Sequence, residues 1–327
     1  MENLEDRKVQ ENQPTPEKQE EAERRKGPVK AYLRVFALTA AGMGILFLYQ
    51  FLGEAGLAIR ALLKGMKLEE TIHIFNNYMI LIVLIGDVLA CFTVWKLLKH
   101  MKLDPFKEGG FQRKISWKRL VISSLTALCG FMAANLLLTL LPISFYNNAG
   151  GFSQSFKRIQ DFSSGLSIVL LFLALCVTGP ATEELIFRGL PVFVGKREGV
   201  RPWACIGIGA LVFGLAHWMT GGLGLVISGT ILGLIFGLVY FQSRSLKTNM
   251  IAHGVVNFPA FLALIFMPDQ LANELPGFSP EALKMTILPI FLYTGFTILG
   301  IRWLKKHPAE DLPSQNPPDH AEDLPGL

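Results

Sequence analysis

The sequence predicts an all-α protein, a polytopic membrane helix bundle of about eight transmembrane helices. Three observations predict this class. Of the 327 residues, 51% are hydrophobic and only 17% are charged, against about 25% charged in an average soluble domain. The mean hydropathy is +0.39. The ends of the chain are rich in charge, whereas the region between them divides into long apolar stretches. This composition excludes a disordered chain, a collagen and a disulfide scaffold.

The apolar stretches set the number of expected spans, because a helix needs roughly 20 residues to cross a hydrocarbon core of about 30 Å. Gly221 and Gly222 separate the fifth stretch from the sixth and predict a tight turn there. In the sixth, Gly229, Gly233 and Gly237 share one helical face, which predicts close packing against a neighbouring helix of the same chain. The stretches cover residues 31–53, 76–98, 120–143, 166–190, 203–220, 222–241, 248–268 and 285–304.

The distribution of Lys and Arg predicts the orientation. Of 31 such residues, 25 lie at the N-terminal end, in the alternate loops that would share its side of the membrane, and at the C-terminal end. The positive-inside rule therefore places both termini in the cytoplasm. No basic stripe interleaved with aromatic residues is present, so the excess charge predicts contact with the lipid bilayer and no nucleic acid. We expect a multi-pass integral protein of the cell (plasma) membrane.

Three domains follow from the composition. Residues 1–30 hold 8 acidic and 7 basic side chains and predict a disordered, charged cytoplasmic tail. Residues 31–306 form the membrane domain. Residues 307–327 predict a disordered, acidic C-terminal tail that repeats Ala-Glu-Asp-Leu-Pro at 309–313 and 321–325.

Ionisable residues inside the spans indicate where the chemistry lies, since each costs roughly 2.5–3.5 kcal/mol at the centre of a membrane helix. The fourth stretch contains Glu183, Glu184 and Arg188. Glu184 and Arg188 are i and i+4, so they share a face and can pair. Glu183 is rotated by about 100° and lacks such a partner, which suits a general base. The same residues could instead form a charge cluster that only ties helices together.

Two further stretches contribute histidines. His217 follows Phe213 by four residues in the fifth, and on its own would more often be a packing residue. In the seventh, His253 and Asn257 project from one face and could stabilise an oxyanion, or equally could bridge two helices. Asp87 stands alone among apolar residues of the second stretch. The sequence offers it no partner, so we interpret it as a structural polar residue.

Taken in order, these motifs resemble the CPBP (Abi) family, which contains the CAAX proteases and bacteriocin-processing enzymes. The pattern is Glu-Glu-x-x-x-Arg at 183–188, Phe-x-x-x-His at 213–217 and His-x-x-x-Asn at 253–257, each in its own apolar stretch. The resemblance covers roughly residues 166–267, which would be the protease core. No matched position departs from the pattern.

The resemblance implies an intramembrane endopeptidase with eight helices that cleaves near the cytoplasmic membrane face. Glu183 would activate water with help from His217, His253 and Asn257 would stabilise the oxyanion, and Glu184 with Arg188 would hold the first motif in place. The substrate would be a peptide or protein at the membrane, lipidated in the best-known case. No cofactor is firmly implied. The sequence has no HExxH motif, although Glu183, His217 and His253 could together hold a zinc ion from separate helices.

Two other classes of function stay open on the sequence alone. One is a non-proteolytic membrane scaffold or bacteriocin-immunity protein on the same fold, because a fold does not guarantee an activity. The other is a transporter that lines its path with the same polar residues. Internal repeats would favour a transporter, and residues 31–143 show no convincing similarity to 166–304.

Overall fold

The structure is a computed structural model and describes residues 29–138, 165–266 and 280–308. Within those ranges it is a helix bundle without strands, as the sequence predicts. Seven of the helices in these ranges are long and apolar enough to cross a membrane. Most of both predicted tails, and both copies of the repeat, lie outside the described residues. The bounds are α3 Val29–Leu63, α4 Leu68–His100, α5 Pro105–Glu108, α6 Trp117–Leu138, α8 Gly165–Phe172, η2 Leu173–Thr178, α9 Gly179–Glu184, η3 Leu185–Gly189, α10 Leu190–Arg197, α11 Pro202–Ala216, α12 Trp218–Ser243, α13 Leu246–Phe266 and α14 Pro280–Lys306.

The predicted fifth span is an apolar helix shorter than expected. Helix α11 has 15 residues and is therefore about 22 Å long at 1.5 Å per residue, less than the thickness of the hydrocarbon core. It ends at His217, directly before α12 begins. The tight turn predicted at Gly221 and Gly222 was therefore placed too late, although Gly222 does have a left-handed φ of 61°.

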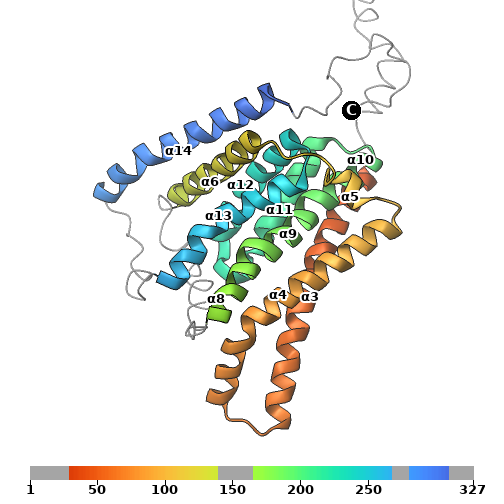
Figure 1. The fold of residues 1–327 in the computed structure, drawn as a ribbon, viewed down its shortest axis with the longest axis vertical. Coiled ribbons are helices and arrows are strands. Elements are labelled where there is room, and N and C mark those ends of the chain that lie inside the picture. Colours follow the sequence, from red (N-terminus) through yellow and green to blue (C-terminus); the bar gives the residue numbers. More distant parts are fainter. Residues whose placement is uncertain (1–28, 139–164, 267–279, 309–327) are drawn as a thin grey trace, which may run out of the picture.

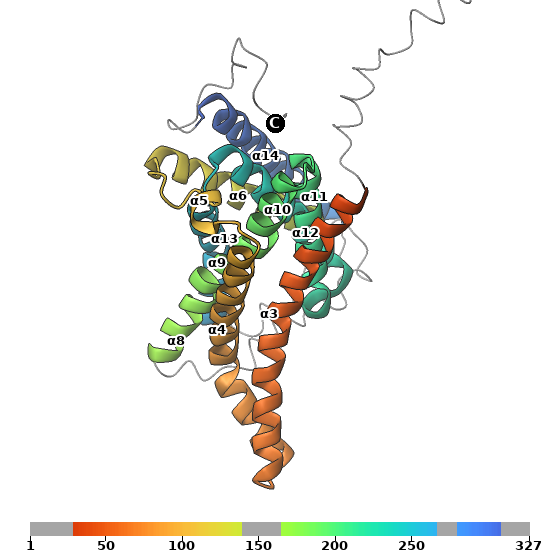
Figure 2. The same cartoon turned by 90° about the vertical axis from the view of Figure 1, so that its right-hand side faces the viewer.

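The helices form an ordered row. In Figure 1, α3 and α4 lie at one edge, α14 and α6 lie at the opposite edge, and the helices of the predicted protease core lie between them. Each edge is a packed pair, α3 against α4 and α6 against α14. The α3–α4 hairpin projects beyond the rest of the bundle, which Figure 2 shows from a second side.

The segments predicted to share one side of the membrane meet at one end of the bundle. At the start of α3, Arg34 pairs with Glu198 at the end of α10, with 2.9 Å between Nη1 and Oε2. Lys247, at the start of α13, donates from Nζ to the carbonyl of Arg113 at 2.7 Å. These contacts agree with the predicted alternation of the helices, while the identity of that side stays a prediction.

The three glycines of α12 pack inside the chain, as predicted. A β-carbon added at any of them would press against α11 or the residues that end it, because the two helix backbones approach so closely. The residues met are Gly214 from Gly229, Ala210 from Gly233 and Ile206 from Gly237. This contact holds the short α11 against the full-length α12.

Candidate active site

The segment that carries both glutamates is an irregular helix. It runs through η2, α9 and η3, two π-helical stretches on either side of one short α-helical piece. The N–H of Gly179 bonds back to the carbonyl of Ala174, five residues earlier. The residue five after Leu175 is Pro180, which has no N–H. We name residues 173–189 the glutamate segment.

Asn257 compensates for that missing donor. Its Nδ2 donates to the carbonyl of Leu175 at 2.9 Å, the group that Pro180 cannot bond. A buried carbonyl in an apolar surrounding needs a partner, so α13 satisfies the irregular backbone of its neighbour. An amide nitrogen carries two hydrogens, and one of those of Asn257 is therefore committed to this contact.

Gly254 allows α13 to approach the glutamate segment closely. A β-carbon at this position would collide with the carbonyl oxygen of Cys176. The motif His253-Gly254-x-x-Asn257 is thus a docking surface in which the histidine and the amide flank the point of closest contact. Glycine is required here by space, because no side chain fits between the two backbones.

Glu184 lies at the centre of a buried polar network. Its side chain is fully buried. Arg188 Nη1 and His253 Nδ1 each lie 2.8 Å from Oε1, and Asn249 Nδ2 donates to Oε2 at 2.7 Å. Because a carboxylate only accepts, all three nitrogens are donors. The predicted pairing of Glu184 with Arg188 is present, and α13 adds two more donors to it.

Two aromatic rings enclose Arg188. Its Cζ lies 4.5 Å from the centroid of Phe213 and 5.1 Å from that of Phe236. Cation–π contacts of this kind favour a guanidinium away from water. Phe236 also stacks on His253 with 4.5 Å between centroids. The two phenylalanines therefore fix the cation and the histidine that both bond to Glu184.

His253 connects the two glutamates. Its Nδ1 bonds Glu184, while its Nε2 lies 3.5 Å from Oε2 of Glu183. The Glu183 side chain is 26% exposed and that of Glu184 is fully buried. The two acids therefore differ as their helical positions predict, since Glu184 is enclosed by donors and Glu183 is partly exposed beside a ring nitrogen.

His217 forms the junction between α11 and α12. Its Nδ1 lies 2.8 Å from the carbonyl oxygen of Phe213, and because a carbonyl accepts, Nδ1 is the donor. In a neutral ring Nε2 is then the nitrogen with the lone pair. The Phe213 ring contacts both histidines edge-on, at 4.8 Å to His217 and 6.0 Å to His253. Both histidines therefore border one aromatic ring.

Asp87 has partners that the sequence did not reveal. It is 3% exposed. Gln50 Nε2 donates to its Oδ1 at 3.5 Å and Thr178 Oγ1 to its Oδ2 at 3.3 Å. Thr182 Oγ1 donates to its main-chain carbonyl at 2.9 Å. Both threonines belong to the glutamate segment, so Asp87 packs against the same segment from the side of α4.

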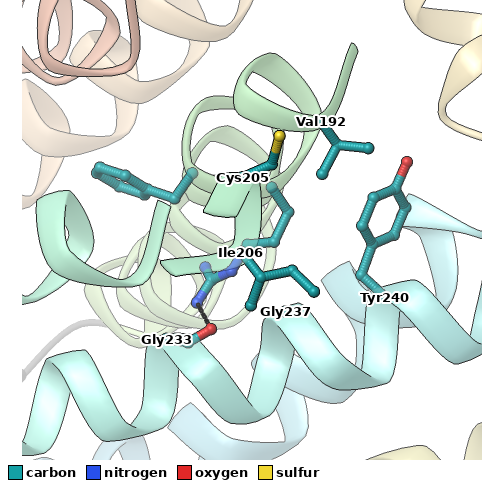
Figure 3. Close-up of a pocket in the computed structure, with 8 residues that line it drawn as sticks. Val192, Cys205, Ile206, Gly233, Gly237 and Tyr240 are labelled. Atoms are coloured by element: carbon teal, nitrogen blue, oxygen red, sulfur yellow. Dashed lines mark hydrogen bonds between the residues drawn. The ribbon is translucent and has the colours of Figure 1, made fainter. Parts of the chain in front are cut away.

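A narrow pocket adjoins the arginine of the network. It lies between α10, α11 and α12, where Cys205, Ile206, Gly237 and Tyr240 line it (Figure 3). Arg188 reaches into this pocket wall with Nη2, which donates to the carbonyl of Gly233 at 3.5 Å. Neither of the two motif glutamates and neither of the two motif histidines lines this pocket. The pocket therefore borders Arg188 and is separate from Glu183.

The residues named for a zinc ion do not form a coordination group. Among the described residues, no set of three or more His, Cys, Asp or Glu side chains is arranged to hold a metal. In His253, Nδ1 is committed to Glu184, and the other nitrogen faces Glu183. Because three protein ligands are usual in catalytic zinc sites, this arrangement of Glu183, His217 and His253 does not fit a zinc ion.

The predicted site residues come together around α13. Glu183, Glu184 and Arg188 connect to His253, Asn257 holds the backbone of their segment, and His217 joins through Phe213. Sequence reasoning missed Asn249 and Phe236. Asn249 precedes His253 by four residues, so the i, i+4 rule that paired His253 with Asn257 could have found it. Phe236 carried no comparable signal.

One comparison with known proteins agrees with this arrangement. Residues 165–259 match the family model described as Type II CAAX prenyl endopeptidase Rce1-like. The matched region contains every predicted site residue, whereas Asp87 lies outside it. No curated protein and no solved structure matches the chain.

The helix bundle and the matched region together define a class. The chain is a multi-pass integral membrane protein, and its central region relates it to the CPBP membrane proteases. Residues 165–259 are thus similar to CAAX-protease-like intramembrane endopeptidases.

Proposed function

We propose that this protein hydrolyses peptide bonds near the cytoplasmic face of the membrane, with Glu183 as the general base. The observation that carries the proposal is the contrast between the adjacent acids. Glu184 is buried and bonded to Arg188, while Glu183 is partly exposed and borders a histidine nitrogen. An acid that is positioned but not neutralised is what proton transfer from a water molecule requires.

The reaction can be written with side chains of this chain. Glu183 takes a proton from water, and the resulting hydroxide attacks the scissile carbonyl carbon. The C–N bond then breaks, and Glu183 returns the proton to the leaving amine. His217, through Nε2, assists in holding the water. Peptide and water are consumed, and a carboxylic acid and an amine are formed.

His253 and Asn257 supply donors for the oxyanion. His253 Nδ1 is already committed to Glu184, so the ring would act on the oxyanion through Nε2, which lies on the side of Glu183. Asn257 retains a second amide hydrogen beyond the one given to Leu175. Donors already oriented in a dry site stabilise a developing negative charge strongly.

The test is cleavage in proteoliposomes by wild type and by Glu183→Gln. The glutamine keeps the shape but cannot accept a proton, so we expect the rate to fall by about 10²- to 10⁴-fold. Glu54→Gln, an acid on α3 outside the site, is the matched control and should retain activity. A Glu183→Gln variant as active as wild type would reject the mechanism.

The same assay tests whether the substrate must carry a lipid and whether cleavage requires a metal. The peptide pool contains each CAAX sequence with and without a farnesyl group, so that a requirement for lipid appears as a difference within a pair. Every reaction is repeated with a zinc chelator. Inactivity of the wild type on all peptides, combined with an unchanged cellular phenotype for Glu183→Ala with His217→Ala, would favour the non-proteolytic scaffold instead.

A further inference from the structure

Asp87 is an acid that the mechanism above does not use. It lies in the middle of the membrane-spanning part of α4 and is 3% exposed. In the described residues no Lys, Arg or His forms an ion pair with it, and its side-chain partners are the uncharged Gln50 and Thr178. An acid in this environment is costly to keep, which indicates a role beyond packing.

The contacts of Asp87 converge on the segment that carries the proposed base. Thr178 and Thr182 are i and i+4, so they share one face of the glutamate segment. The one hydroxyl hydrogen of Thr178 is shared between the carboxyl of Asp87 at 3.3 Å and the carbonyl of Leu173 at 3.2 Å, and Thr182 donates to the main-chain carbonyl of Asp87. Glu183 follows Thr182 directly in the chain.

The glutamate segment needs support from outside because its own backbone is irregular. α9 has six residues, no side-chain cap at its start, and π-helical turns on both sides. On the side of α13 it is held by His253, which bonds Glu184, and by Asn257, which bonds Leu175. On the side of α4 the polar contacts include those of Asp87 with Thr178 and Thr182. The segment is thus fixed between two helices.

We propose that Asp87 is a positioning residue, which anchors the glutamate segment to α4 and thereby sets the location of Glu183. This inference rests on the proposed function for its effect on the rate. Its effect on the segment does not depend on that function. Asp87 forms no hydrogen bond with Glu183 in the described structure, and it does not contact the reacting atoms. It acts on the segment through Thr178 and Thr182.

The test compares Asp87→Ala with Asp87→Asn. Alanine removes the acceptor for Thr178, whereas asparagine retains a carbonyl oxygen at the same place. We expect Asp87→Ala to lower kcat by about 10- to 100-fold, since small displacements of a reacting group have effects of that size. KM should stay within about twofold, because uniform binding is untouched. Asp87→Asn should restore most of kcat.

A second measurement is independent of catalysis. Hydrogen–deuterium exchange of residues 178–184, in protein reconstituted in nanodiscs, should be faster in Asp87→Ala than in wild type and near wild type in Asp87→Asn. Thr39→Val is the matched control, since Thr39 is buried in α3 and its hydroxyl bonds only its own helix at Val35. It should change neither exchange of 178–184 nor kcat. Should Asp87→Ala fail to fold, Thr178→Val removes the same contact between Thr178 and the carboxyl of Asp87.

The outcomes separate the two proposals. Faster exchange with a lower kcat supports the anchoring role. Unchanged exchange in Asp87→Ala overturns it, and so does faster exchange with an unchanged kcat in an active enzyme. If the wild type cleaves no peptide, the proposed function fails, and exchange of 178–184 still decides whether Asp87 is the anchor.

Discussion

Two helical segments of nearly equal length cross this bundle in different ways. α3 has 35 residues and the segment Gly165–Arg197 has 33, and both are apolar enough to span a membrane. α3 is α-helical throughout, with no charged residue between Arg34 and Glu54. Gly165–Arg197 contains two π-helical stretches. Glu183 and Glu184 lie in the α-helical piece between them, and Arg188 lies in the second stretch. Helical irregularity therefore coincides with charge in the membrane.

The difference has a physical reason. π-helical turns alter the direction of the side chains that follow them and often occur at functional sites. A regular helix without proline would leave no unbonded carbonyl for a neighbour to bond. In the glutamate segment the freed carbonyl of Leu175 recruits Asn257, so the irregular backbone itself orders α13 around the acids.

The largest expected loss of stability is at the buried ion pair of Gly165–Arg197, and it is compared with the loss at the surface ion pair of α3. Arg188→Ala leaves Glu184 buried with its charge uncompensated, which should lower the free energy of unfolding by about 3–5 kcal/mol. Unfolding is measured by titration with SDS in mixed micelles. The matched variant on α3 is Arg34→Ala, which breaks the pair of Arg34 with Glu198. The arginine side chain of that pair is 60% exposed, so the loss should be about 0–1 kcal/mol. Equal losses for the two variants would remove the distinction drawn here.

A smaller effect is expected where α13 meets the glutamate segment. Gly254→Ala places a β-carbon against the carbonyl of Cys176, and overpacking of this kind should cost about 1–3 kcal/mol. The displaced α13 would also move His253 and Asn257, so cleavage should decline in the same variant. Stability and activity are measured on one preparation, and a fully stable, fully active Gly254→Ala would show that the two backbones can separate without consequence.

The smallest effect is expected on α3, and it has the opposite sign. A β-carbon at Gly56 would meet no atom within 4 Å. Gly56→Ala should therefore raise the free energy of unfolding by about 0.5–1 kcal/mol, because alanine restricts the unfolded chain and favours a helix. The same titration reports it, with cleavage expected to remain at the wild-type level. A loss of stability would indicate that α3 has a close neighbour at this position.

The sequence predicted those features that depend on spacing along one helix. The pairing of Glu184 with Arg188 and the shared face of His253 and Asn257 follow from i, i+4 geometry, and the structure contains both. The roles proposed for Glu183, His217, His253 and Asn257 stay predictions. The glycines of α12 were assigned to packing within the chain, and the structure agrees because each one faces α11.

Features that depend on contacts between distant helices were out of reach. The partners of Asp87 lie 91 and 95 residues away at Thr178 and Thr182, a separation that no local pattern encodes. The π-helical register of the glutamate segment could not be derived either, since Pro180 removes one backbone donor but does not specify the register of the turns around it. The end of α11 at His217 was missed because the following residues are as apolar as those before it.

The ring of His253 couples the two glutamates, so that a mutation of Glu184 also affects the position of Glu183. One nitrogen faces Glu184 and the other faces Glu183, so turning the ring over would place carbon atoms opposite both carboxylates. Stacking on Phe236 further restricts such a turn. The ring is thus a rigid mechanical link between an enclosed ion pair and an accessible acid. A change made at Glu184 reaches Glu183 through this side chain as well as through the backbone that the two residues share, although Glu184 itself is closed to solvent.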